Sequence, residues 1–140
     1  MYRSRAERKF YYYYLAASDE DVCAFCNPPE KELHEQTENF FVLRNIFPYS
    51  FWDYHRVTEH LMIVPRRHIE SIEKLSDAAK VEFTDLVGRY EGKGYNIYGR
   101  AAGSNVKTVP HQHTHCIKIG PRPVRMLFFW RKPYLRWIKW

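Results

Sequence analysis

Three histidines occupy alternate positions in the segment His111-Gln112-His113-Thr114-His115. In a β-strand, side chains at positions i, i+2 and i+4 share one face, with about 7 Å between successive ones. The spacing therefore predicts a row of imidazoles on one face of a sheet. Because an imidazole can donate and accept a proton near neutral pH, such a row can divide coordination, nucleophilic attack and proton donation among its members. The alternative is a metal-binding tract or a set of plain exposed histidines.

Two cysteines, Cys23 and Cys26, form a C-x-x-C motif that is followed by the sequence Asn-Pro-Pro. A thioredoxin-like redox motif would begin a helix at the second cysteine, and the prolines favour a knuckle turn instead. A knuckle presents two thiolates to a zinc ion, for which His68 and one histidine of the triplet are available as further ligands. The alternative is a pair of reduced cysteines without metal. The third cysteine, Cys116, falls in the strand after the triplet, where we expect it to be packed.

Local patterns predict an α+β fold with an antiparallel sheet. We expect strands over residues 38–44, 60–64, 95–98 and 113–119, the last closed by Gly120-Pro121. A helix is expected after Ser76 as N-cap, with apolar residues at helical spacing and with Gly92 and Gly94 at its end. The acidic clusters at residues 19–21 and 30–38 are interpreted as solvated surface.

Composition limits the classes of protein to which the chain can belong. With 140 residues, we expect a single domain, residues 1–140, that buries a core of its own. The hydrophobic share of 45% and the aromatic share of 17% exclude a disordered chain, and no apolar run approaches the ~20 residues of a membrane-spanning helix. Three cysteines are too few for a disulfide scaffold, and the tyrosine-rich N-terminal stretch is a poor signal peptide. We therefore expect a reduced, cytoplasmic protein.

The last twenty residues, 121–140, form a basic and aromatic extension. They contain no acidic residue, and their basic residues are Arg122, Arg125, Arg131, Lys132, Arg136 and Lys139. Their aromatic residues are Phe128, Phe129, Trp130, Tyr134, Trp137 and Trp140. This composition suits an anionic membrane surface or nucleic acid. The alternative is an extension that packs its aromatic rings on the core or on a second subunit, with the charged heads in water.

Together these motifs resemble the histidine triad (HIT) superfamily of nucleotide hydrolases and transferases, over a core of about residues 22–120. The triplet with Cys116-Ile117 is similar to the family's alternating histidine signature. The segment from His60 to Ile69 resembles the family's second landmark, a strand ending in Pro-basic-x-His-Ile. The resemblance implies an HIT-like antiparallel sheet of about five strands with one main helix.

The upstream C-x-x-C motif resembles the zinc-bearing, bacterial-type branch of the family. For that branch the resemblance implies a structural zinc ion with Cys23, Cys26, His68 and His111 as ligands. Four protein ligands would close the coordination shell and tie the knuckle to the strand that carries the other histidines.

The resemblance also implies catalytic roles. His113 would attack the α-phosphorus of a nucleoside phosphoramidate or a dinucleoside polyphosphate, forming a nucleotidyl-histidine that water resolves. Its other ring nitrogen should donate to a backbone carbonyl, and His115 would assist departure of the leaving group. The substrate-binding residues implied are Thr108 for phosphate, Asn45 for ribose and, at a polar position between loop and strand, Asn96.

The sequence departs from the family pattern at three places. Lys107 replaces a glutamine expected at the phosphate, where it would clamp a more anionic substrate or point to solvent. Gln112 and Thr114 replace apolar residues, so the face opposite the histidines is expected to be wetter or covered by the extension. Retention of the third histidine, His115, favours a hydrolase over a transferase.

Two other functions remain open, and so does the assembly. One is a nucleotidyltransferase, and the other is a non-catalytic nucleotide or nucleic-acid binding module that uses the basic aromatic extension. The resemblance further implies a homodimer.

Overall fold

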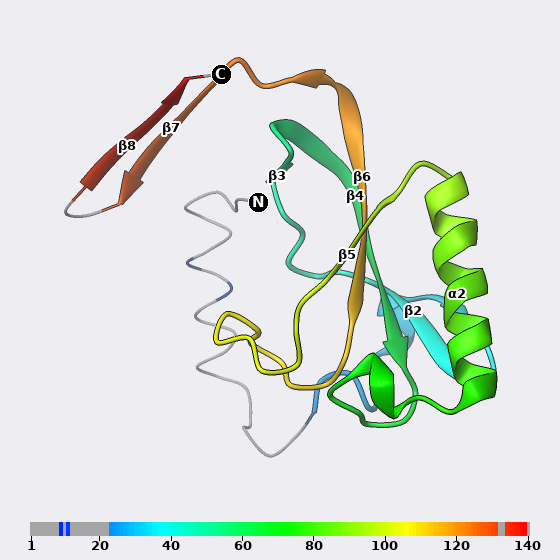
Figure 1. Cartoon of the computed structure of the whole chain (residues 1–140). Helices are drawn as coiled ribbons and strands as arrows, with labels where there is room; N and C mark the ends of the chain where they lie inside the picture. Colours follow the sequence, from blue (N-terminus) through cyan, green and yellow to red (C-terminus); the bar gives the residue numbers. More distant parts are fainter. Residues whose placement is uncertain (1–8, 10, 12–22, 132–133, 140) are drawn as a thin grey trace.

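The chain was analysed as a computed structural model, which describes Lys9, Tyr11, residues 23–131 and residues 134–139. Its main feature is a six-stranded antiparallel sheet in the order β1-β2-β4-β6-β5, with β3 paired to β4. The strands are β1 (Leu33–Gln36), β2 (Phe40–Arg44), β3 (Phe51–Trp52), β4 (His55–Pro65), β5 (Asn96–Gly99) and β6 (Thr114–Pro123). The long helix α2 (Asp77–Gly92) lies against the sheet (Figure 1). This α+β architecture confirms the predicted fold class, with six strands rather than about five.

Helix α2 begins where the sequence predicted. The Ser76 side chain accepts a hydrogen bond from the Ala79 amide, as an N-cap should. Gly94 follows the helix with a φ of +83°, a left-handed conformation that glycine adopts without steric cost. There are also two short 3₁₀ helices, η1 (Glu30–Glu32) and η2 (Ile72–Lys74).

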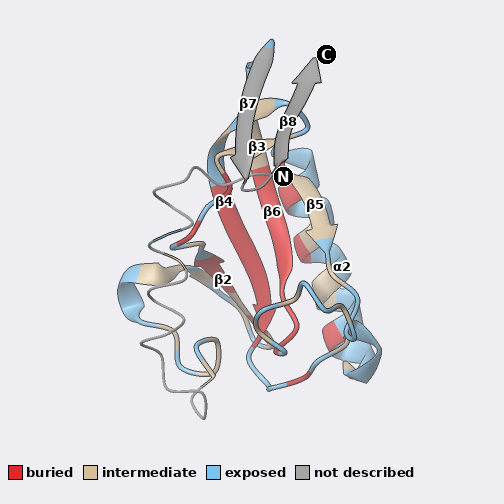
Figure 2. Ribbon diagram, turned by 90° about the vertical axis from the view of Figure 1, so that its left-hand side faces the viewer, coloured by how far each residue is buried: buried red, intermediate tan, exposed pale blue. Residues whose placement is uncertain are grey.

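The two faces of the sheet pack differently because successive side chains of a strand alternate. On one face, α2 covers an apolar cluster that includes Leu61, Ile63 and Cys116. On the other face, Met62 and Val64 form a cluster with Leu43. The partly buried side chains that pack against this cluster are Phe25, Leu33 and Phe41. The central strands β4 and β6 are the most deeply buried (Figure 2). The histidine triplet shares the second face, since His115 is paired with Met62 across the sheet.

The face opposite the histidines is dry, which corrects one expectation. Gln112 and Thr114 are buried, with exposed fractions of 4% and 3%. Thr114 precedes Cys116 on the same face, so helix α2 and its apolar cluster cover this side. Among the described residues, no hydrogen-bond partner reaches the Thr114 hydroxyl.

Strand β6 is longer than predicted. It continues past Gly120-Pro121 to Pro123, because the first half of β4 supplies a partner strand as far as His55. Irregularities in the pairing around Val57 accommodate prolines, which cannot donate to the ladder. The predicted extension from residue 121 therefore begins inside the sheet.

Strand β1 was not predicted, and its region was interpreted as solvated acidic surface. Glu35 corrects this, since its carboxylate accepts hydrogen bonds from Arg89 at 2.6 Å and from Tyr90 at 2.9 Å. Burial alone would raise the pKa of Glu35, but these two donors outweigh it and lower the pKa. The acidic cluster at residues 19–21 lies outside the described residues.

The C-terminal residues form a second, two-stranded antiparallel sheet of β7 (Met126–Arg131) and β8 (Tyr134–Lys139). It follows β6 and is not hydrogen-bonded into the main sheet (Figure 1). In the described part of the chain, no helix is both long and apolar enough to cross a membrane.

Candidate functional site

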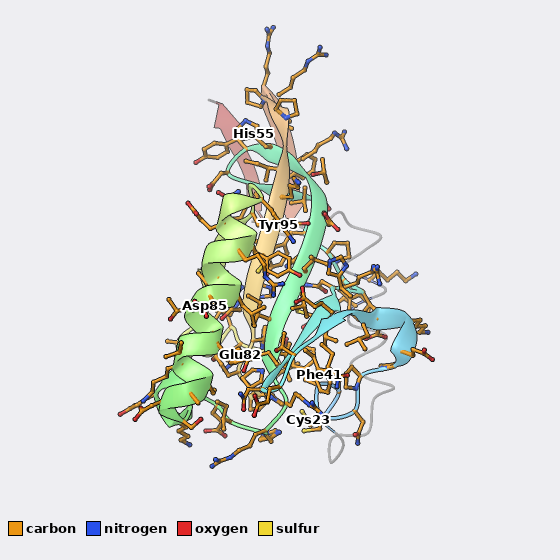
Figure 3. All side chains as sticks on the ribbon, turned by 90° about the vertical axis from the view of Figure 1, so that its right-hand side faces the viewer. Cys23, Phe41, His55, Glu82, Asp85 and Tyr95 are labelled. Carbon is orange, nitrogen blue, oxygen red and sulfur yellow. The ribbon has the colours of Figure 1, made fainter. Side chains whose placement is uncertain are left out.

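Four predicted metal ligands meet at one end of the sheet. The donor atoms of Cys23, Cys26, His68 and His111 all lie within 4.8 Å of one another. The amide of Cys26 donates to the Cys23 carbonyl at 3.2 Å, which closes the predicted knuckle turn. Figure 3 shows Cys23 near the end of the sheet that is opposite His55, the first residue of β4. The ligands therefore gather around the last residues of β4 and the start of β6.

The spacing of these atoms fits a tetrahedral ion. His111 Nδ1 lies 3.3 Å from Cys23 Sγ and 3.7 Å from Cys26 Sγ, and His68 Nδ1 lies 3.3 Å from Cys26 Sγ. Tetrahedral zinc with normal bond lengths separates a sulfur and a nitrogen ligand by about 3.5 Å. His111 Nε2 donates to the Pro65 carbonyl at 2.9 Å, so Nδ1 carries the lone pair and faces the thiols. The four residues are thus compatible with zinc.

The second histidine of the triplet presents a lone pair to a neighbouring cavity. His113 Nδ1 lies 2.8 Å from the His111 carbonyl oxygen, which can only accept, so Nδ1 carries the proton. The resemblance implied that this ring donates to a backbone carbonyl, and the carbonyl is that of His111. Burial lowers the pKa of His113, and the positive charges of Lys107 and Arg100 act in the same direction. His113 is therefore a neutral imidazole whose unprotonated nitrogen is Nε2.

In the third histidine, His115, the proton is on the other ring nitrogen than in His113. The backbone amide of Tyr49 donates to His60 Nδ1 at 3.2 Å. Asn45 Nδ2, which can only donate, lies 3.4 Å from His60 Nδ1 and 3.2 Å from His60 Nε2. Because both donors reach Nδ1, we assign the proton of His60 to Nε2. His60 Nε2 lies 2.9 Å from His115 Nδ1, which must accept this hydrogen bond. The proton of a neutral His115 is consequently on Nε2. Two neighbouring histidines, with ring centroids 5.0 Å apart, thus hold opposite protonation patterns.

Aromatic rings surround the pair of His60 and His115. Tyr49 lies 4.7 Å from the His60 ring and 5.5 Å from the His115 ring, and Tyr98 stacks on His115 at 5.9 Å. Trp52 contacts both tyrosines. His60 and His115 are 5% and 4% exposed. This packing holds the two rings in one orientation and keeps water from their shared hydrogen bond.

A cavity of about 530 Å³ opens at these histidines, a size that suits a small-molecule ligand. Its wall includes His113, His115, Asn45, Lys107 and Thr108, so the structure brings together five of the six predicted catalytic and substrate-binding residues. Of the described residues that line it, Arg44, Arg100 and Lys107 are cationic, whereas Glu32 alone carries a carboxylate. An excess of positive charge suits a phosphorylated ligand.

Two of the predicted binding residues are held by contacts within the protein. Asn45 Oδ1 accepts from the Phe47 amide at 2.9 Å, which fixes the turn after β2. Lys107 Nζ donates to the Glu70 carbonyl at 3.1 Å and lies 3.3 Å from Gln112 Oε1. Burial lowers the pKa of Lys107, and the nearby charge of Glu70 opposes this. Lys107 is therefore a partly buried residue of the cavity wall whose ammonium group has two oxygen partners within the protein.

Asn96 is the predicted residue that the structure does not bring to the cavity. It pairs with Ile117, further along β6 than the histidines, and its amide donates to the Ile117 carbonyl at 3.2 Å. This hydrogen bond gives Asn96 a structural partner. Cys116 is fully buried as predicted, and burial raises the pKa of its thiol to about 12.

Sequence reasoning missed His60, Arg44 and Arg100 as candidate site residues. His60 precedes the apolar run of β4, and only the register of β4 on β6 places it beside His115. Arg44 is the last residue of β2, and Arg100 directly follows β5. Binding residues are often found where a strand meets a loop, so this position could have indicated both arginines as candidates.

Comparison with solved structures identifies the fold. An HIT family hydrolase from Legionella pneumophila Philadelphia 1 is 21% identical, with a TM-score of 0.52 over 72% of this chain and 94% of that chain. An HIT family hydrolase from Clostridium thermocellum is 20% identical, with a TM-score of 0.52 over 74% of this chain and 93% of that chain. No family model and no curated protein matches the sequence. The fold of this chain is therefore the HIT fold.

Proposed function

We propose that this protein is a nucleotide hydrolase that acts at the α-phosphate of a nucleoside phosphoramidate or a dinucleoside polyphosphate. His113 Nε2 attacks the α-phosphorus, and the bond from phosphorus to the leaving group breaks. The product of this step is a nucleotidyl-histidine. Water then attacks the same phosphorus, the bond to His113 breaks, and a nucleoside monophosphate and a proton are released.

The observation that carries this proposal is the hydrogen bonding of two histidines in one cavity, from which we assign them opposite protonation. His113 has a lone pair on Nε2, as a nucleophile requires. His115 has a proton on Nε2, which suits a hydrogen bond to the departing atom as negative charge develops there. A polyphosphate departs as the anion, whereas an amine must also take up a proton from solvent.

The cations of the cavity support a phosphorylated substrate. Lys107 and Arg100 line the same wall as His113, and Arg44 stands beside Asn45. Their charges favour an anionic group close to the nucleophile. Thr108 and Asn45 line the same cavity, as the candidate contacts to the phosphate and to the ribose.

The zinc-bearing branch is part of the same proposal. A zinc ion held by Cys23, Cys26, His68 and His111 has no open coordination position, so it would supply structural rigidity rather than chemistry. His111 is both a ligand and the acceptor that fixes the tautomer of His113 through its carbonyl. The metal would thereby hold the nucleophile in position.

The proposal is tested by intact-protein mass after mixing with a panel of phosphoramidates and dinucleoside polyphosphates, quenched at alkaline pH. We expect a nucleotide-sized adduct or released nucleotide for the wild type and neither for His113→Ala. His34→Ala removes an exposed histidine outside the cavity and is the matched control. Turnover that survives His113→Ala would contradict covalent catalysis.

Product analysis distinguishes the proposed hydrolase from a nucleotidyltransferase and from a non-catalytic binding module. A nucleotidyltransferase would give a new nucleotide ester or anhydride when an acceptor is added, and little free monophosphate. A binding module would bind nucleotide without any turnover, and His113→Ala would leave that binding unchanged.

The predicted partners extend this proposal. A homodimer is tested by light scattering. Binding of the C-terminal extension to an anionic membrane is tested with vesicles of anionic lipid, to which the protein should no longer bind when residues 124–140, which follow β6, are deleted. Unchanged binding after this deletion would contradict a role for the extension. Cytoplasmic location likewise stays a prediction.

A further inference from the structure

An N-terminal tyrosine lies in the wall of the histidine cavity. Tyr11 lines the cavity together with His113, His115 and Thr108. Its hydroxyl donates to Thr108 Oγ1 at 2.5 Å, a contact between residues 97 positions apart. No step of the proposed reaction involves Tyr11.

The ring of Tyr11 is anchored separately from its hydroxyl. Its centroid lies 5.1 Å from that of Phe47, with the two planes 75° apart, an edge-to-face arrangement that aromatic rings prefer. Phe47 is 9% exposed, and its amide is bound to Asn45 Oδ1. The tyrosine therefore spans the cavity wall from the Asn45 turn, where we place the ribose, to Thr108, where we place the phosphate.

The hydrogen bond to Tyr11 determines which way the Thr108 hydroxyl can donate. A hydroxyl has one proton to donate and lone pairs that accept. Because Thr108 Oγ1 accepts from Tyr11, its own proton remains available for a second acceptor. A hydroxyl that accepts a hydrogen bond is also polarised into a better donor. Thr108 is otherwise exposed, so without this contact its hydroxyl would rotate freely among water molecules.

We propose that Tyr11 is a positioning residue that orients the Thr108 hydroxyl toward the phosphoryl group of a bound nucleotide. This inference rests on the proposed function, because it needs a phosphate beside Thr108. It adds a residue outside the HIT-like core to the substrate site. Tyr11 acts through Thr108 by its hydroxyl and through Phe47 by its ring, so the two contributions can be separated by substitution.

The test measures binding of adenosine and guanosine monophosphates and of the corresponding nucleosides by calorimetry. Tyr11→Phe keeps the ring and removes the hydroxyl, so we expect nucleotide binding about fivefold weaker and nucleoside binding unchanged. Tyr11→Ala also removes the ring, so both ligands should bind more weakly. Tyr54→Phe, at an exposed tyrosine outside the cavity, is the matched control and should change neither.

A double-mutant cycle distinguishes positioning from a general structural effect. After Thr108→Val, Tyr11→Phe should have no further effect on nucleotide binding, and in turnover assays the single Tyr11→Phe change should raise KM more than it lowers kcat. The inference is wrong if Tyr11→Phe weakens the binding of nucleotide and nucleoside equally, or if it weakens nucleotide binding to the same extent in the Thr108→Val variant. In either case the proposed hydrolase function can stand. If the wild type binds neither monophosphate, the inference and the proposed function both fail. If binding follows the expected pattern without turnover, Tyr11 keeps its positioning role and the hydrolase proposal fails.

Discussion

Loss of one thiol from the metal cluster should remove the metal and the stability that it provides. Cys26 Sγ lies 3.3 Å from His68 Nδ1 and 3.7 Å from His111 Nδ1, so it is close to both histidine ligands. The ligands come from three separate chain segments, and unfolding must therefore release the ion. At free zinc a thousandfold above Kd, the metal contributes about 4 kcal/mol to the free energy of unfolding. For a chain of this size, this raises Tm by about 15 °C.

The assay is metal content by mass spectrometry together with Tm measured with and without zinc. We expect one zinc per chain in the wild type, none in Cys26→Ser, and a zinc-dependent rise in Tm that falls from about 15 °C to a few degrees. Cys116→Ala is the matched control, because Cys116 is buried outside the cluster. It should lower Tm through a small cavity and keep the full zinc-dependent rise. A wild type that binds no zinc, or a Cys26→Ser variant that keeps one equivalent, would refute the reasoning.

Three further substitutions test individual contacts. The pKa of Glu35 is lowered mainly through Arg89, so its ion pair stabilises the fold above the usual carboxyl pKa and is lost as pH falls through the folded value. Glu35→Gln should cost about 1 kcal/mol in urea unfolding at pH 7 and much less at pH 3, and an equal cost at both would contradict this. Thr114→Val removes a buried hydroxyl with no described partner and should raise the free energy of unfolding by about 1 kcal/mol in the same assay, whereas a loss would show that the hydroxyl is bonded. His60→Ala frees the His115 ring and should lower kcat at least about tenfold with little change in KM, and an unchanged kcat would exclude the hydrogen-bonded pair from catalysis.

The fold could be predicted as far as local patterns reach. Ser76 and Gly94 are recognisable as helix boundaries because capping depends on residues a few positions apart. Strand β1 was missed because Leu33–Gln36 is short and polar, and its pairing with β2 supplies the stability that its sequence lacks.

The site shows the same division between local pattern and tertiary contact. The spacing of the triplet and of the C-x-x-C motif indicated a row of imidazoles and a pair of thiols, since residues two or three positions apart have a fixed geometry. The full set of four ligands, which the structure brings together, was implied by the resemblance to the HIT superfamily. The sequence did not indicate that Asn96 would bond to a strand carbonyl instead of reaching the cavity.

The sequence by itself determined which chemical groups this protein has and where helix α2 begins. Tertiary structure alone decided which of those groups meet. The register of β4 on β6 sets His60 against His115, and the folded chain brings Tyr11 to Thr108. These contacts join residues 55 and 97 positions apart. The physical reason is that register is fixed by which faces of the strands become buried in the assembled sheet, so contacts between distant residues depend on tertiary packing.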